Sequence, residues 1–121
     1  MGYDAFPVRS STERIYVTHL FMVGTGATVP TETFGAGVVM TRTAAGRLKL
    51  TWADDPGVFA GVTWGIGATT QGDVKGHTVT HSVYPLTAGT YTLEIDIWDS
   101  AFAAEDLEAL EWLTLNIHFK R

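Results

Sequence analysis

Two pairs of side chains have spacings that could support chemistry. His77 and His81 are four residues apart, and Glu94 and Asp96 are two apart. On a β-strand the histidine spacing corresponds to about 13 Å, whereas the ligands of one metal ion lie ~2 Å from it. The acidic spacing corresponds to about 6.6 Å, which is within the range of paired glycosidase carboxylates. Because acidic residues ordinarily occupy the outward face of a sheet, we interpret this pair as solvent-facing. The Thr-rich surroundings of the two histidines predict a solvent or interface face.

Other motifs with chemical potential are incomplete. Asp54-Asp55-Pro56-Gly57 has the composition of a tight turn and lacks an Asp-x-Asp-x-Asp-Gly calcium loop. Gly24-Thr25-Gly26 lacks the remaining residues of a phosphate loop. The chain contains no Cys, which excludes a thiol nucleophile and a zinc-thiolate site. The sequence therefore predicts a protein that is not an enzyme and that has no cofactor and no metal.

Charge and length exclude two classes of partner. The 121 residues fit one domain, and the formal net charge is −5. The eight Lys and Arg residues are scattered, whereas a nucleic-acid surface needs clustered basic side chains. No apolar stretch reaches the ~20 residues needed to span a bilayer. The N-terminus lacks the pattern of a signal peptide. We expect neither nucleic acid nor membrane as a partner.

The elements that must position these residues are short alternating segments. The clearest is Val38–Trp52, two alternating runs around a turn that contains Gly46. The other predicted strands are Ile15–Val23, Val58–Ile66, His77–Tyr84, Tyr91–Trp98 and Trp112–Lys120. Gly24–Thr33 is predicted to be a loop, and Ala101–Leu110 is the single stretch with helical character. The pattern predicts an all-β, antiparallel sandwich or barrel with at most one short helix.

Two of these strands carry unusual faces. Ile15–Val23 is apolar on both sides, with Tyr16, Leu20 and Met22 on one of them, which favours a central strand or one covered by a partner. In Val58–Ile66 the alternation predicts that Val58 and Ala60 share a face with Val62, Trp64 and Ile66. Gly61, Gly65 and Gly67 then fall on the other face, where something bulky could lie close.

Residues 1–13 are predicted to be an arm, distinct from a single β-domain over residues 14–121. Pro7 and the Ser-Ser-Thr cluster after Arg9 oppose regular structure, yet Tyr3, Phe6 and Val8 gain by burial. We expect this arm to pack on its own domain or on a neighbouring subunit.

The four Trp residues are many for a chain of this length. Trp98 falls on the polar side of its strand and Trp112 precedes the last one, so at least one is expected near the surface. Three interpretations stay open: a protein interface, packing at the rim of the core, and a platform on which sugars stack. The interface candidates are Tyr3, Phe6, Val8, Tyr16, Leu20, Met22, Trp98 and Trp112.

Three stretches carry a family resemblance. GVVMTRTAAGRLKLTW, VFAGVTWGIGATT and YTLEIDIWDSAFAAEDLEALEWLTLNIHFKR together resemble the small tailed-bacteriophage proteins that decorate or cement capsids. The shared pattern is a hairpin, a Gly-rich central strand, and a final pair of strands joined by a small-residue insertion. The resemblance runs from Val38 to the C-terminus and so covers about two thirds of the chain. It implies a jelly-roll-like fold, no enzymatic activity, and attachment to the capsid lattice, often as trimers.

Together these observations predict a structural virion protein located on the capsid surface. Its expected partners are itself, as a homotrimer, and the major capsid protein of a phage. The alternative is a carbohydrate-binding β-sandwich module from a phage tail or receptor-binding device, with Trp98 and Trp112 stacking on sugars. A small-molecule enzyme is a third interpretation.

Overall fold

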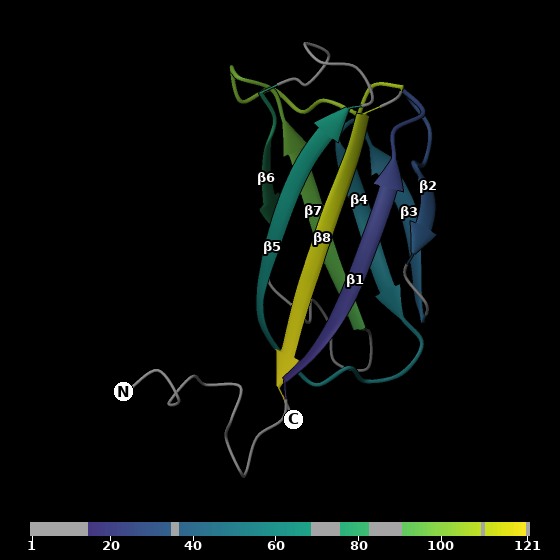
Figure 1. The fold of residues 1–121 in the computed structure, drawn as a ribbon, viewed down its shortest axis with the longest axis vertical. Helices are drawn as coiled ribbons and strands as arrows, with labels where there is room; N and C mark the ends of the chain where they lie inside the picture. The colour runs from purple at the N-terminus through teal and green to yellow at the C-terminus, as the bar shows by residue number, and fades with distance from the viewer. Residues whose placement is uncertain (1–14, 35–36, 69–75, 83–90, 110, 121) are drawn as a thin grey trace.

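The chain folds into two antiparallel four-stranded sheets packed against each other (Figure 1). The computed structural model describes residues 15–34, 37–68, 76–82, 91–109 and 111–120. One sheet has the strand order β2-β1-β8-β5 and the other β3-β4-β7-β6. The strands are β1 (Ile15–Val23), β2 (Thr31–Phe34), β3 (Val38–Ala44), β4 (Arg47–Trp52), β5 (Val58–Ala68), β6 (Thr78–His81), β7 (Tyr91–Trp98) and β8 (Glu111–Lys120). This β-sandwich confirms the predicted all-β, antiparallel class.

Strict alternation builds the core between the two sheets. Along β8, every second side chain is buried, from Leu113 to Phe119, and β7 contributes Leu93, Ile95 and Ile97 opposite. Burial of each such side chain stabilises the fold by about 1.5–3 kcal/mol. The ring of Trp52 on β4 meets that of Phe119 edge-on at 5.2 Å, which links the two sheets.

The doubly apolar strand β1 is internal to its sheet, between β2 and β8. Leu20 and Met22 lie on its inner side and are 0% exposed in the core. Their predicted role as interface residues is therefore wrong, because the inner face of an internal strand is covered by the opposite sheet. Tyr16 remains 44% exposed near the start of the strand. The predicted Tyr3, Phe6 and Val8 contacts lie outside the described residues.

Strand β5 corrects the predicted faces of its segment. A β-bulge between Phe59 and Gly61 shifts the register against β8 by one residue. Because one inserted residue reverses the side on which the preceding side chains lie, Phe59 packs on the core while Val58 is 68% exposed. Beyond the bulge, Gly67 faces outward, and the Trp112 indole fills the space that a Cβ there would occupy. The prediction of a bulky group close to these glycines is confirmed at Gly67 alone, because a Cβ at Gly65 would meet only Thr114 Oγ1 at 3.2 Å and one at Gly61 would meet nothing within 4 Å.

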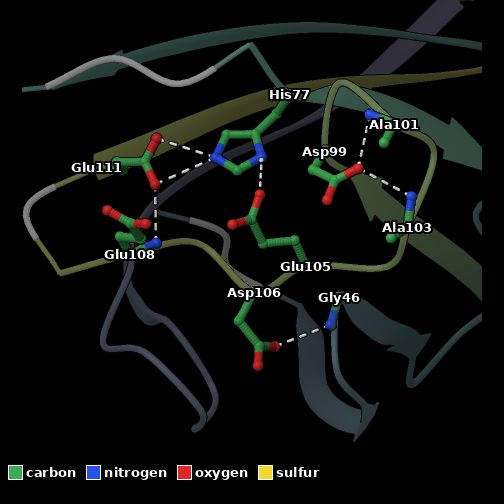
Figure 2. Close-up of polar contacts among 9 residues, drawn as sticks. All are labelled: Gly46, His77, Asp99, Ala101, Ala103, Glu105, Asp106, Glu108 and Glu111. Atoms are coloured by element: carbon green, nitrogen blue, oxygen red, sulfur yellow. Dashed lines mark hydrogen bonds and ion pairs between the residues drawn. The ribbon is translucent and has the colours of Figure 1, made fainter. Parts of the chain in front are cut away.

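Two further local predictions are corrected. The segment predicted as a loop over Gly24–Thr33 ends in strand β2, which begins at Thr31. Residues 99–109, named the strap here, connect β7 to β8 and form no helix. Instead, Asp99 Oδ1 accepts hydrogen bonds from the backbone N–H groups of Ala101 and Ala103, at 2.8 and 2.9 Å (Figure 2). Such Asp side-chain bonds favour turns over helical continuation. Among the described residues, no helix is long and apolar enough to cross a membrane.

Candidate functional site

A buried histidine between two carboxylates is the most chemically distinctive feature of the fold (Figure 2). His77, just before β6, places Nε2 3.1 and 3.0 Å from the two carboxylate oxygens of Glu111. Its Nδ1 lies 3.4 Å from Oε2 of Glu105 in the strap. The His77 side chain is 0% exposed, so the predicted solvent or interface face is wrong for this residue. Its partner Glu111 lies 34 residues away, and no local signal identifies it.

The buried carboxylate of Glu111 has a second hydrogen bond. The backbone N–H of Glu108 donates to Glu111 Oε1 at 2.8 Å, and the Glu111 side chain is only 2% exposed. His77 Nδ1 forms no hydrogen bond with any described residue, and its contact with Glu105 is an ion pair when the ring is protonated. Buried charges are stabilised only when they are paired. The contacts of His77 with Glu105 and Glu111 therefore link the start of β6 to the strap and to the start of β8.

The strap is also hydrogen-bonded to the β3–β4 hairpin. The guanidinium of Arg42 donates two hydrogen bonds to the Asp106 carboxylate, at 2.9 and 2.8 Å. The backbone N–H of Gly46 donates to the same carboxylate at 2.9 Å (Figure 2). The hydrogen bond from Arg42 holds the pKa of Asp106 below its ordinary value of 3.8, and in turn raises the pKa of Arg42. Such paired, bidentate bonds fix geometry as well as charge.

Close backbone approach fixes the same strap. Gly46 has φ +68°, and a Cβ there would lie 2.6 Å from the backbone of Glu105 and of Ile97. Leu107 in the strap is 1% exposed within the core, and its carbonyl accepts the Gly26 N–H at 3.2 Å. Among the described residues, no group of three or more His, Asp or Glu side chains could hold a metal ion. The contacts of the strap with the β3–β4 hairpin, with His77 and with Glu111 hold the two sheets together at one end of the sandwich.

The outer face of the β2-β1-β8-β5 sheet is nearly uncharged, and we name it the neutral face. It consists of the outward-pointing residues of β1, β5 and β8: Ile15, Val17, His19, Phe21, Val23, Val58, Gly61, Thr63, Gly65, Gly67, Trp112, Thr114, Asn116, His118 and Lys120. Lys120 is the only Lys, Arg, Asp or Glu in this set. Val17 is 51% exposed, and the Phe21 and Trp112 rings lie 6.2 Å apart. The buried centres of protein interfaces are likewise depleted of charged residues and rich in aromatic ones.

The histidines on the neutral face have their own partners in the sheet. His19 Nδ1 lies 2.6 Å from Asn116 Oδ1 on the neighbouring strand, and His19 is exposed. His19 is therefore a hydrogen-bonded surface residue, although its strand is apolar on both faces. His118 faces outward between Val17 and Gly61 of the flanking strands.

The outer face of the β3-β4-β7-β6 sheet carries opposite charges in register, and we name it the charged face. Lys49 lies opposite Glu94, and Arg47 opposite Asp96. Arg47 Nε donates to Asp96 Oδ1 at 3.1 Å. Cross-strand pairs of opposite charge are a normal feature of solvated sheet surfaces. This geometry supports the solvent-facing interpretation of Glu94 and Asp96 over a glycosidase pair.

The two candidate Trp residues lie on opposite outer faces. Trp98 is on the charged face, where its indole N–H donates to Thr80 Oγ1 at 2.8 Å. Trp112 is on the neutral face, against Gly67 and near Phe21. The structure therefore does not bring Trp98 and Trp112 together into one stacking surface.

A third Trp, missed as an interface candidate, lies on the open edge formed by β5. Trp64 points to the inner side of its strand, yet it is 44% exposed, because among the described strands β5 has a hydrogen-bonded neighbour, β8, on one side only. Tyr16, the remaining described candidate, lines a hollow of about 290 Å³ with Val17, Thr18, Pro56 and Phe119. Edge position depends on strand order, which alternation in the sequence does not encode.

Comparison with known proteins gives no relative: no protein-family model, no curated protein and no solved structure matches this chain.

Proposed function

We propose that this protein is a structural component of a phage particle, which binds the capsid shell and associates with copies of itself. The observation that carries the proposal is the neutral face, a three-strand surface with Lys120 as its one permanently charged side chain. Burial of apolar surface there contributes roughly 25 cal/mol per Å² before the cost of association is subtracted. The capsid as partner, the jelly-roll-like topology and the trimeric state come from the sequence resemblance alone.

The carbohydrate-binding alternative has less support. It relied on Trp98 and Trp112 as a joint stacking platform, and they occupy opposite faces of the sandwich. Trp98 with its neighbours Thr78 and Thr80 offers at most a single aromatic ring. We therefore favour assembly through the neutral face.

The proposal is tested by co-sedimentation with purified tailed-phage shells stripped of their decoration proteins. The wild-type chain is expected to pellet with at least one type of shell. Val17→Glu places a charge at a 51% exposed position of the neutral face and should weaken binding at least tenfold. The matched control is Val39→Glu, a 65% exposed position of the charged face, which should bind like the wild type. A wild-type chain that pellets with no shell and stays monomeric at high micromolar concentration contradicts the proposal.

The N-terminal segment provides a second test. Deleting residues 2–10 removes Tyr3, Phe6 and Val8 and should leave the β-domain folded while it weakens oligomer or shell association. Ordering such a segment costs about 1–2 kcal/mol per residue, so its few apolar side chains need backbone hydrogen bonds from a partner. Circular dichroism and light scattering measure the two outcomes separately. If the deletion unfolds the domain, the segment belongs to the domain's own core. If association stays unchanged, the segment is a passive tail.

A further inference from the structure

We propose that the free edge of β5 pairs in antiparallel fashion with the β5 edge of a second copy of this chain, across a two-fold axis. The inference rests on the self-association in the proposed function and specifies its contact. It departs from the trimer implied by the resemblance, because a two-fold contact produces dimers.

Strand β5 differs from the other three edge strands of the sandwich. It has 11 residues, whereas β2 and β6 have four each. Strand β3 has seven residues and carries Arg42. In Figure 1, β5 forms one rim of its sheet, and β8 is its only paired strand among the described residues. A long edge strand presents a row of unpaired backbone groups that another strand can join.

The sequence of β5 lacks the devices that normally protect an edge. VFAGVTWGIGA contains no charged residue and no proline. Its one irregularity, the bulge between Phe59 and Gly61, lies near the start and leaves Val62–Ala68 in regular register with β8. Proteins usually blunt exposed edges with lysine, proline, short length or bulges. An uncharged regular stretch of this length therefore favours pairing with another strand.

The side chains on this edge suit a pairing contact. Trp64 is 44% exposed at the open side of the core, and Thr63 next to it is exposed on the neutral face. An antiparallel pairing centred near these residues would bring the two Trp64 rings close to each other at the middle of the contact. Aromatic side chains at the centre of an interface commonly carry much of its binding energy.

A second β5 is favoured over other occupants by its chemistry. In a two-fold antiparallel pair each strand meets its own sequence, and an uncharged strand meets itself without like-charge repulsion. The N-terminal segment carries Asp4, Arg9 and Pro7, and proline cannot donate to a strand ladder. The N-terminal segment of a neighbouring copy is therefore a less favourable partner for the β5 edge than a second β5.

The chain has no cysteine, so single-cysteine variants report this contact directly. Thr63→Cys and Gly65→Cys lie on the outward side of β5, and Thr41→Cys is the matched control on the β3 edge. With a short bis-maleimide crosslinker, the β5 variants are expected to form covalent dimers at least tenfold faster than Thr41→Cys. Equal rates would overturn the proposal, because an edge occupied by the neighbour's N-terminal segment would hold the two β5 cysteines apart.

Sedimentation velocity supplies an independent measurement. Thr63→Lys adds a charge to each strand of the pair at an exposed position, and Thr41→Lys adds the same charge to β3. Thr63→Lys should raise the dimer dissociation constant at least tenfold, and Thr41→Lys should leave it unchanged. A wild-type trimer, or a dimer unaffected by Thr63→Lys, overturns the strand pairing. A chain that is monomeric yet binds shells overturns this inference and the self-association on which it rests, and leaves the capsid role standing. A β5-linked dimer that binds no shell overturns only the capsid role.

Discussion

The two outer faces of the sandwich are built on the same alternation and differ in what the alternate positions carry. On the charged face, Lys49 and Arg47 oppose Glu94 and Asp96 across β4 and β7. On the neutral face, the corresponding outward positions carry Val17, His19, Phe21, Trp112 and their neighbours. The inner positions of both sheets contribute apolar side chains to one shared core. The difference between the faces is therefore not required by the core, and the neutral face is the one to which we assign assembly in the proposed function.

Tryptophan has a different environment on each face. Trp98 uses its indole N–H in a hydrogen bond to Thr80, which suits a solvated surface. Trp112 lies against the glycine strand β5, where no side chain separates its ring from the backbone of Gly67. The Trp112 ring therefore lies close to the sheet on the neutral face, 6.2 Å from the ring of Phe21, and aromatic residues are enriched in protein interfaces.

The largest loss of stability is expected at Gly46, which lies against the backbone of the strap that connects the two sheets. A substitution there tests whether the two faces depend on this contact. Gly46→Ala combines a positive φ with a Cβ 2.6 Å from backbone atoms of Glu105 and Ile97. We expect a loss of about 3 kcal/mol or more, from strain plus overpacking. Gly76→Ala, whose Cβ would meet nothing within 4 Å, is the control. Urea unfolding measures the free energy of unfolding of both variants. A loss of less than about 1 kcal/mol for Gly46→Ala would show that the strap backbone shifts at little cost.

The pH dependence of the Arg42–Asp106 pair gives the next effect. The pKa of Asp106 is lowered in the folded protein by the hydrogen bond from Arg42. The pair therefore stabilises the fold fully above the ordinary value of 3.8, and this contribution is lost as the pH falls below 3.8 through the lowered pKa. Asp106→Asn should reduce the loss of stability between pH 5 and pH 2, measured as melting temperature.

Glu32 is the internal comparison for that pH series. Its pKa is raised by burial, so its protonation favours folding as the pH falls. Removing it by Glu32→Gln should steepen the acid loss of stability, opposite to Asp106→Asn. If the two variants change the acid profile in the same direction, the assignment of the Asp106 pair is wrong.

A smaller effect is expected on the neutral face itself. Gly67→Ala places a Cβ where the Trp112 indole lies, so the ring must leave the strand surface. We expect a loss of about 1–2 kcal/mol, together with a red-shifted Trp fluorescence. The matched change on the charged face is Trp98→Phe, which removes the indole N–H bond to Thr80 and should cost about 1 kcal/mol or less. Equal spectral changes in both variants would remove the distinction between the two Trp sites.

The smallest effect belongs to the charged face. The Arg47–Asp96 pair is 3.1 Å long, and the Arg47 side chain is 51% exposed. Exposed pairs of this kind contribute about 0.2–1 kcal/mol and are screened by salt. Arg47→Met should lower stability by that amount at low salt and by almost nothing in 1 M NaCl. A loss that persists in 1 M NaCl would indicate that the stem of Arg47 packs on the sheet instead.

The sequence by itself determined most of the strands, and it determined the buried side of a strand where one face is apolar and the other polar. In β4 the buried side carries Leu48, Leu50 and Trp52, as the alternation of that segment implies, because one face of the strand is apolar and the other polar. Trp98 was placed correctly on a polar face for the same reason. Asp55 and Gly57 form the predicted turn, with the Gly57 N–H donating to Asp55 Oδ1 at 2.8 Å.

Only the tertiary structure decided the features for which local pattern gives no preference. In β1 both faces are apolar, so the choice of Leu20 and Met22 as core required the position of the opposite sheet. The burial of His77 depended on Glu111, which is distant in sequence and adjacent only after β6, the strap and β8 come together. The bulge in β5 placed Val58 on the outer face of the sheet, because one extra residue moves the preceding side chains to the other face without a change in composition. Strand order left β5 and its Trp64 at an open edge, and that order results from long-range pairing, to which local alternation is insensitive.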